Sequence, residues 1–144
     1  MAFWDGSLDA HACVVYARAV VQSPWGDQST VETNLLYAKN RVAPLEGSTI
    51  AKMEIQGLVQ ATRSLLKLVC SLDQKIDRVV LSGDSMCSIM MARQDGASLK
   101  VYFQNRVAEI TQNLRAISAR VGYMEPISKI AGVQNPADVA TVQG

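Results

Sequence analysis

The chain has 144 residues, of which 49% are hydrophobic, and its formal net charge is +1. These values predict one globular domain with one sizeable hydrophobic core and exclude an intrinsically disordered chain. Because the charge is nearly balanced, binding to nucleic acid through an overall basic excess is also excluded. Any such contact must be local, or assisted by metal ions or by a neighbouring domain.

Three segments in the first third of the chain have the composition of β-strands, with β-branched and aromatic residues bounded by Gly, Pro or Ser. They cover residues 2–5, 11–21 and 31–39. Because the links between them are short, we expect a three-stranded antiparallel meander. On the third strand we expect Leu35 and Tyr37 to share one face.

A long helix is predicted next, from an N-cap at Ser48 or Thr49 to about Cys70. Its apolar stripe repeats at helical spacing and consists of Leu58, Ala61, Leu65 and Leu68. Glu54 shares this stripe, one turn before Leu58. A charged residue on the core-facing side of a helix requires a reason.

The second half of the chain alternates short strands with helices. We predict a buried strand of parallel type at 77–81 and a final strand at 121–127. Helices are predicted at 85–93 and 99–117, and a last one begins with Asn135 as N-cap and Pro136 in the first helical position. This order of elements predicts an α/β fold with a mixed sheet flanked by helices.

Few side chains are available for histidine or cysteine chemistry. The single histidine, His11, excludes a multi-histidine metal site. Cys13, Cys70 and Cys87 form no CxxC pair, which favours reduced, mostly buried thiols in an intracellular protein, and we expect a cytoplasmic location. The chain shows no signal peptide and no apolar stretch of the roughly 18 residues that a membrane span requires, so we expect no membrane partner.

Four acidic residues lie where such a fold can gather them. They are Asp5 near the end of the first strand, Glu54 on the core face of the first long helix, Asp84 at the carboxyl end of the parallel-type strand, and Asp138 in the first turn of the last helix. Because clustered carboxylates repel one another unless cations neutralise them, the pattern indicates hard divalent ions such as Mg²⁺. Two such ions about 3.5–4 Å apart can activate a water and stabilise the leaving oxygen of a phosphodiester.

Each of these acids also has an ordinary structural interpretation. Asp5 can be a turn residue, Glu54 a partly exposed helix glutamate, Asp84 the cap of the following helix, and Asp138 a complement to a helix dipole. From pattern and spacing alone, both interpretations stay open.

Several motifs resemble those of the ribonuclease H domain of Bel/Pao-type long-terminal-repeat retrotransposons. AKNRVAPL at 38–45, followed by TIAKMEI at 49–55, is similar to the family's AKSRVAPL and TIPRLEL. NRVAEI at 105–110 and NPAD at 135–138 match the family's motifs, and SGDS at 82–85 is close to its SDS. WDGS at 4–7 is close to the family's DAS and to the wider superfamily's DGS. The matches follow the family's order across nearly the whole chain.

The resemblance implies a ribonuclease H-like fold, with a five-stranded mixed sheet of three antiparallel strands followed by two parallel ones. It implies that Asp5, Glu54, Asp84 and Asp138 are the catalytic residues and the ligands of two Mg²⁺ ions, for which Mn²⁺ can substitute. The implied activity is a metal-dependent endoribonuclease that hydrolyses the RNA strand of RNA–DNA hybrids during reverse transcription. The loop before Asn135 is longer than in the family and lacks a histidine that aids product release, so we expect slower or differently limited turnover.

Further residues are candidates for contact with the substrate. They are the backbone amides of Gly6 and Ser7 and the side chains of Lys39, Asn40, Arg41, Ser85, Asn105 and Arg106. Helix packing or a solvated face is the alternative for Asn105 and Arg106, and helix capping is the alternative for Ser85.

The implied partners are an RNA–DNA hybrid, the reverse transcriptase and the other domains of the same polyprotein. We expect residues 1–144 to be a single domain excised from that polyprotein, acting in a virus-like particle or reverse-transcription complex. The alternative to an enzyme is a catalytically weak or inactive interaction or connection module. A nuclease or integrase-like protein with another substrate is a third possibility, against which the family motifs outside the acids count.

Overall fold

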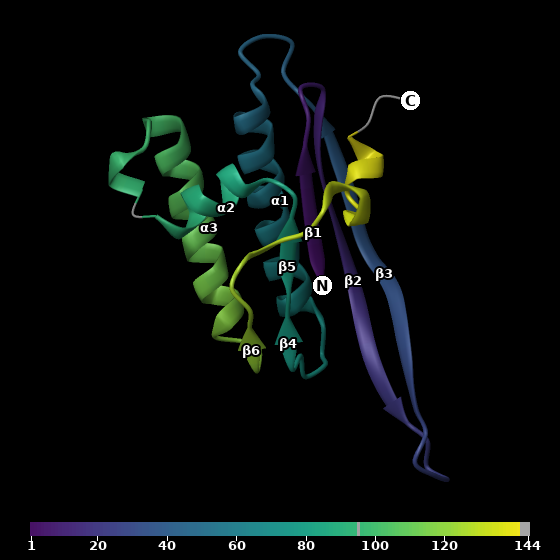
Figure 1. Cartoon of the computed structure of the whole chain (residues 1–144). Coiled ribbons are helices and arrows are strands. Elements are labelled where there is room, and N and C mark those ends of the chain that lie inside the picture. The colour runs from purple at the N-terminus through teal and green to yellow at the C-terminus, as the bar shows by residue number, and fades with distance from the viewer. Residues whose placement is uncertain (95, 142–144) are drawn as a thin grey trace.

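The first three strands form the antiparallel meander that the sequence predicts, in a computed structural model that describes residues 1–94 and 96–141. Strands β1 (Ala2–Gly6), β2 (Ala10–Gln22) and β3 (Ser29–Val42) pair in order, with β2 in the middle. β2 and β3 extend well past β1 as a two-stranded ribbon (Figure 1). Trp25, in the loop that joins them, is 94% exposed, so this end of the ribbon adds nothing to the core.

The pairing of β2 with β3 contains one irregularity that corrects a prediction. Val15 pairs with Tyr37, whereas the next residue, Tyr16, pairs with Leu35, so Leu36 is an extra residue in β3. Because successive residues of β2 point to opposite faces, this bulge places Leu35 and Tyr37 on opposite faces. Tyr37 packs against the core and Leu35 is exposed.

Helix α1 (Ile50–Ser71) packs on β1 and β2 and agrees with the predicted helix to within a residue or two at each end. Thr49 is its N-cap, because the Thr49 hydroxyl accepts a hydrogen bond of 3.2 Å from the Lys52 amide. Three members of the predicted apolar stripe are buried, and the fourth is partly buried against the core. The stripe is therefore confirmed.

The first of the two later predicted strands is divided in two, whereas the second, 121–127, contains one short strand and is followed by another just beyond its predicted end. The resulting strands are β4 (Arg78–Val79), β5 (Leu81–Gly83), β6 (Tyr123–Met124) and β7 (Ser128–Lys129). The main sheet has the order β3-β2-β1-β5-β7 with β1, β5 and β7 parallel, and β4 and β6 form a separate parallel pair. The fifth strand of the sheet thus follows Pro126 instead of ending there, because proline has no N–H to donate to a ladder. The α/β class and the five-stranded mixed sheet are confirmed.

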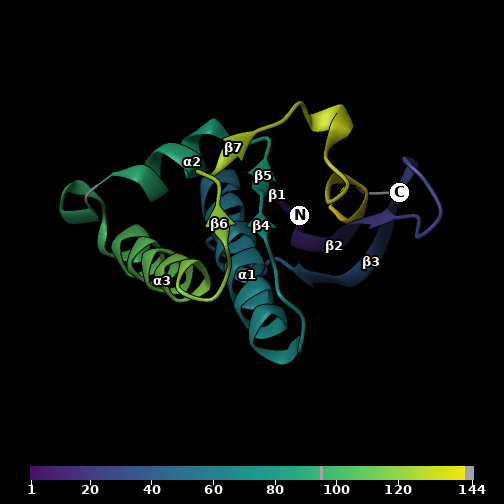
Figure 2. The ribbon, with the colours of Figure 1, turned by 90° about the horizontal axis from the view of Figure 1, so that it is seen from below.

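Helices α2 (Met86–Arg93) and α3 (Val101–Ser118) lie with α1 on one side of the sheet, as Figure 2 shows. The short 3-10 helix η1 (Gly96–Ser98) lies between α2 and α3 in the chain. The largest fully buried side chains lie between these layers and include Trp4, Ile55, Leu58, Leu81, Ile89, Ile110 and Ile117. Contrary to expectation, only one of the three cysteines, Cys13, is buried. Within 1–94 and 96–141, no helix combines the length and the apolar character needed to cross a membrane.

The predicted last helix is wrong within the described residues. Asn135 ends the 3-10 helix η2 (Gly132–Gln134), and only the single turn η3 (Asp138–Ala140) follows. The Asn135 side chain is buried, and both ends of its amide are hydrogen-bonded. Its Nδ2 donates to the Trp4 carbonyl at 2.8 Å, and its Oδ1 accepts from the Ala137 amide at 3.1 Å. The asparagine anchors the segment to β1 instead of starting an α-helix. Residues 142–144, the rest of the predicted helix, lie outside the described residues.

Candidate metal centre

Three of the four predicted acids are brought together. One carboxylate oxygen from each of Asp5, Glu54 and Asp84 lies within 4.8 Å of the others. β1 and β5 are parallel neighbours in which Trp4 pairs with Gly83, so the residues that follow this pair, Asp5 and Asp84, are adjacent. The sheet topology alone therefore explains two members of the cluster.

Two glycines allow the third acid to approach. A Cβ atom on Gly6 would collide with the backbone of Met53 and Glu54, and a Cβ atom on Gly57 would lie 2.6 Å from the Asp5 carbonyl oxygen. Because neither glycine has a side chain, the first turns of α1 rest directly on the end of β1. This contact places Glu54 beside Asp5.

The cluster is electrostatically strained without a cation. The Glu54 side chain is only 8% exposed, and burial, followed by the charges of Asp5 and Asp84, raises the pKa of Glu54 to about 8. Burial and then the charge of Asp5 also raise the pKa of Asp84 above its usual value. Glu54 Oε2 and Asp84 Oδ1 are buried and have no hydrogen-bond partner among the described residues. The site thus holds acceptors that no donor in residues 1–94 and 96–141 satisfies.

These features suit a hard divalent cation. The donor set is made only of carboxylate oxygens, which Mg²⁺ and Mn²⁺ prefer. The unpaired oxygens would coordinate a cation at this position. Its positive charge would offset the repulsion among the carboxylates and lower the raised pKa values of Glu54 and Asp84. Carboxylates grouped for a purely structural reason would instead pair with Lys, Arg or backbone amides.

Asp138 lies near the cluster but is not one of the three acids within 4.8 Å. It belongs to η3, which packs against β1 and β2 on the face opposite α1 (Figure 2). Its negative charge adds to the effects that raise the pKa of Asp84, so it faces the same site. The structure thus supports a group of three acids with a fourth beside it.

Sequence reasoning did not find Thr141. Its hydroxyl donates a hydrogen bond to Asp5 Oδ2, and the same Oγ1 lies 3.1 Å from the Asp138 carbonyl oxygen, which can share the proton. It therefore joins the carboxylate at the end of β1 to the turn that carries Asp138. The only local signal was a polar residue three positions after Asp138, which by itself indicates nothing.

The predicted substrate contacts near the cluster already have partners within the protein. The Ser7 amide donates to the Ala10 carbonyl at 2.8 Å, and the Ser7 hydroxyl donates to the Thr141 carbonyl at 3.0 Å. The Ser85 hydroxyl accepts a hydrogen bond of 3.3 Å from the Ser88 amide and caps α2. For these residues, as for Gly6, contact with a substrate stays a prediction.

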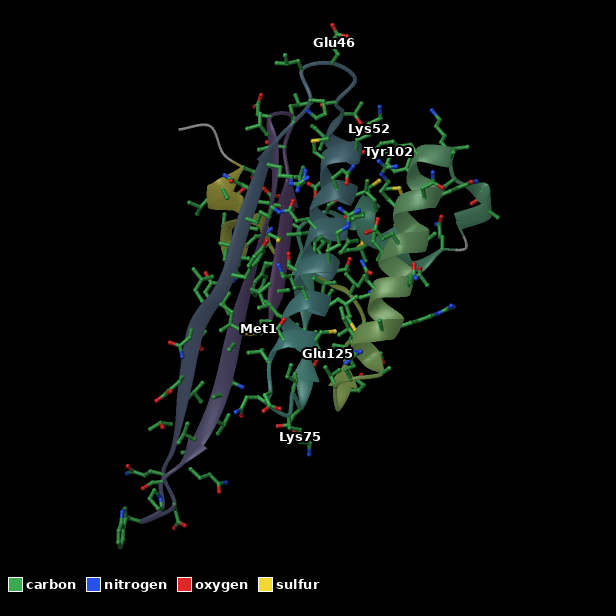
Figure 3. All side chains as sticks on the ribbon, turned by 180° about the vertical axis from the view of Figure 1, so that it is seen from behind. Met1, Glu46, Lys52, Lys75, Tyr102 and Glu125 are labelled. Atoms are coloured by element: carbon green, nitrogen blue, oxygen red, sulfur yellow. The ribbon has the colours of Figure 1, made fainter. Side chains whose placement is uncertain are left out.

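The remaining predicted contacts lie on β3 and α3. Lys39 and Arg41 are exposed on β3, and Asn40 alternates with them along the strand. Arg106 lies over the Tyr102 ring, 4.0 Å from its centroid, and Lys52 approaches the same ring at 5.2 Å (Figure 3). Asn105 is exposed on α3.

Comparison with known proteins agrees with this architecture. Residues 1–85 match a family model described as the Pao retrotransposon-like RNaseH-like domain. Among solved structures, RNase H1 from the halophilic archaeon Halobacterium salinarum NRC-1 is similar with a TM-score of 0.58 and 14% sequence identity, over 96% of this chain and 90% of that one. At that identity the likeness shows the fold alone. Comparison with curated proteins gave no match. Because the family model covers more than half of the sequence and spans Asp5, Glu54 and Asp84, the chain belongs to the family of Pao retrotransposon-like RNaseH-like domains.

Proposed function

We propose that this domain is a metal-dependent endoribonuclease that hydrolyses the RNA strand of RNA–DNA hybrids during reverse transcription of a retroelement. The observation that carries the proposal is the convergence of Asp5, Glu54 and Asp84 in a chain of this family, with two buried carboxylate oxygens that have no partner in the described part of the chain. A degenerate, purely structural copy of the domain would have no reason to keep this repulsive group of acids.

In the proposed mechanism, Asp5, Glu54, Asp84 and Asp138 would hold two divalent cations, Mg²⁺ or, in its place, Mn²⁺. When bound, such a pair supplies activation of a water and stabilisation of the leaving oxygen in phosphodiester hydrolysis. Thr141 holds the Asp5 carboxylate in place through its hydroxyl. Burial, followed by the charges of Asp5 and Asp84, raises the pKa of Glu54 to about 8 in the absence of metal, so Glu54 would have to give up a proton to serve as a ligand at neutral pH.

The proposed substrate and partners follow from the family. We propose an RNA–DNA hybrid as substrate, and the reverse transcriptase and other domains of one polyprotein as partners, in a virus-like particle or reverse-transcription complex. A hybrid is distinguished by 2′-hydroxyls on one strand and by groove shape, so sequence-specific contacts to bases are not needed.

A cleavage assay tests this function. The domain is incubated with a labelled RNA–DNA hybrid, and with RNA and DNA duplexes as controls, in Mg²⁺, in Mn²⁺ and in EDTA. We expect cleavage of the hybrid's RNA strand only, and only with metal. Mutation of a residue that only hydrogen-bonds a metal ligand typically costs about 10–100-fold in metal affinity or activity. Asp84 is itself a proposed ligand, so Asp84→Asn should reduce the cleavage rate by about 100-fold or more.

Asp73→Asn is the matched control, because Asp73 is an exposed acid outside the cluster. It should cleave like the wild type. Cleavage that survives EDTA, or that Asp84→Asn leaves unchanged, would contradict the metal mechanism. Absence of cleavage even in Mn²⁺ would favour the non-catalytic interaction module.

A further inference from the structure

A basic groove lies between α1 and β3, apart from the carboxylate cluster. Its volume is about 570 Å³, and neither Asp5, Glu54 nor Asp84 lines it. Five cationic side chains do: Lys39, Arg41, Arg63, Lys67 and Arg106. They are five of the 14 Lys and Arg residues of the chain, and no Asp or Glu among the described residues lines the groove. The nearly balanced net charge therefore conceals a strongly uneven distribution of charge.

Most of this positive charge is not neutralised from within the protein. Arg63 pairs with Glu109, with a hydrogen bond of 2.8 Å from Arg63 Nη2. Among the described residues, Lys39, Arg41, Lys67 and Arg106 form no ion pair. Positive charges gathered on one surface raise its electrostatic potential, and such a surface attracts a polyanion.

A buried polar atom in the same groove provides an independent sign of a ligand. His11 lines the groove, its side chain is only 8% exposed, and its Nδ1 has no hydrogen-bond partner within 1–94 and 96–141. On the strand ladder His11 pairs with Arg41, so imidazole and guanidinium lie side by side. Unsatisfied buried polar atoms are rare in proteins and often mark an ion or water that the protein binds.

The elements that form the groove are held together by contacts within the protein. Gln60 Nε2 donates to the Lys39 carbonyl at 3.1 Å, and Ser64 Oγ lies 3.6 Å from Cys13 Sγ, so α1 is joined to both β3 and β2. The groove therefore exists before any ligand binds, which lowers the entropic cost of binding.

The spacing of the cations favours an extended anion with regular charges. Arg63 and Lys67 are one helical turn apart, about 6 Å along α1, and Lys39 and Arg41 are separated by about 6.8 Å along β3. The lining of α1 runs from Gln56 to Ser71, roughly 22 Å at the rise of an α-helix. A row of phosphates matches two such rows of cations.

We propose that this groove binds the phosphate backbone of a single nucleic-acid strand, outside the catalytic centre. Tyr37, which also lines the groove, offers a ring for contact with a base, as in other grooves that bind single strands without sequence preference. The inference rests on the proposed function only in that a nucleic acid, rather than another polyanion, is taken as the ligand. A strand held here would add affinity that the weak overall charge of the domain cannot supply.

Binding is tested by fluorescence anisotropy of labelled 12-nucleotide DNA and RNA single strands, in EDTA so that no metal contributes. The Lys39→Glu/Lys67→Glu variant is compared with Arg18→Glu/Lys75→Glu, which changes the net charge equally. Arg18 and Lys75 do not line the groove, and Lys75 lies beyond the C-terminal end of α1 (Figure 3). Equal melting temperatures of the two variants establish that both are folded.

The groove variant should bind both strands about tenfold more weakly than the wild type in 50 mM salt, and the control variant less than about threefold more weakly. The slope of log affinity against log salt should fall by about 1.4 in the groove variant, since each lost contact removes about 0.7 for a single strand. Equal losses in both variants, no binding by the wild type, or stronger binding of a polyglutamate peptide of the same charge would overturn the inference.

The same assay separates this inference from the proposed catalysis. Asp84→Asn should bind single strands in EDTA as the wild type does, because Asp84 does not line the groove. Single-strand binding without hybrid cleavage would leave the groove assignment intact while removing the nuclease. Hybrid cleavage without single-strand binding would support the nuclease function and overturn the groove assignment.

Discussion

At the scale of residues, the acid cluster depends on glycines that take no part in its chemistry. Gly6 and Gly57 let α1 rest on β1, and without that contact Glu54 would not reach Asp5. The loop before Asn135 makes a third close approach, because a Cβ atom on Gly132 would lie 3.1 Å from Asp84 Oδ2. The positions of the carboxylates are thus set by close backbone contacts.

Gly6→Ala tests this dependence. The added methyl group collides with the α1 backbone, so we expect a loss of about 1–3 kcal/mol in the free energy of unfolding, measured by urea denaturation. The affinity for Mn²⁺, measured by calorimetry, should also fall, because Glu54 is displaced. Gly26→Ala is the control, since no atom of the described residues lies within 4 Å of its added methyl group. If Gly6→Ala matches this control, α1 and β1 are not in such close contact.

The raised pKa of Glu54 predicts how stability depends on pH in the absence of metal. Above the ordinary glutamate pKa of 4.5 the unfolded chain has lost this proton, whereas the folded protein keeps it up to about pH 8. The unfolded state therefore binds fewer protons in this window, so the free energy of unfolding falls as pH rises from 4.5 to about 8. A difference of one bound proton between the two states changes the free energy of unfolding by about 1.4 kcal/mol per pH unit. The total decrease should therefore reach a few kcal/mol.

Urea titrations in EDTA across this pH range measure the effect. Glu54→Gln carries no titratable proton and should flatten most of the decrease, becoming more stable than the wild type near pH 8. A stability that is constant or increases between these pH values in the wild type, and that Glu54→Gln leaves unchanged, would contradict the raised pKa of Glu54.

At the scale of elements, the segment after β7 closes the site from the face opposite α1. It is held to β1 at two points, through the Asn135 amide on the Trp4 carbonyl and through the Thr141 hydroxyl on Asp5. Asp138 lies between these two anchors. The described part of the segment contains only the two short 3-10 helices η2 and η3, so its position on the sheet depends on the anchors more than on helical hydrogen bonds of its own.

Asn135→Ala should therefore affect both stability and metal binding. Loss of the buried hydrogen bonds should cost about 1–3 kcal/mol in the free energy of unfolding, and the displaced Asp138 should lower the Mn²⁺ affinity. Asn113→Ala is the control, because it removes a 3.1 Å hydrogen bond to Thr62 that lies between α3 and α1. It should lower stability but leave Mn²⁺ affinity unchanged. Equal metal affinities in both variants would show that the segment does not position a ligand.

At the scale of the whole molecule, stability and metal binding are linked. The folded domain gathers carboxylates that the unfolded chain keeps apart, so cations bind the folded state preferentially. At a Mg²⁺ concentration 100 times the dissociation constant, this linkage contributes about 2.7 kcal/mol. For a domain of this size, we expect the melting temperature to rise by roughly 6–10 °C.

Differential scanning calorimetry with and without Mg²⁺ or Mn²⁺ measures this rise. Asp84→Asn should melt at a higher temperature than the wild type in EDTA, because one like charge is removed, and should respond much less to metal. Asp73→Asn should respond as the wild type does. A wild-type melting temperature that is indifferent to divalent metal would contradict the cluster.

The sequence by itself determined the elements whose signals are local. The cap at Thr49 and the apolar stripe around Leu58 predict α1 because capping and helical periodicity act between near neighbours in the chain. The positions of Asp5, Glu54 and Asp84 at the ends of successive elements predict their meeting, since neighbouring strand ends and the helix above them share one edge. The family motifs then distinguished this cluster from four ordinary acids.

Only the tertiary structure decided the features that depend on distant partners. Asn135 carries a strong helix-start signal, yet its amide binds the Trp4 carbonyl, 131 residues away in the chain, and the segment becomes a 3-10 turn. The bulge at Leu36 and the burial of His11 likewise depend on what the neighbouring strand and α1 present. The basic groove gathers residues from four elements, so no window of sequence contains it. Local preferences of about 1 kcal/mol per residue are overridden by burial and long-range hydrogen bonds, which is why these features appear only in the folded chain.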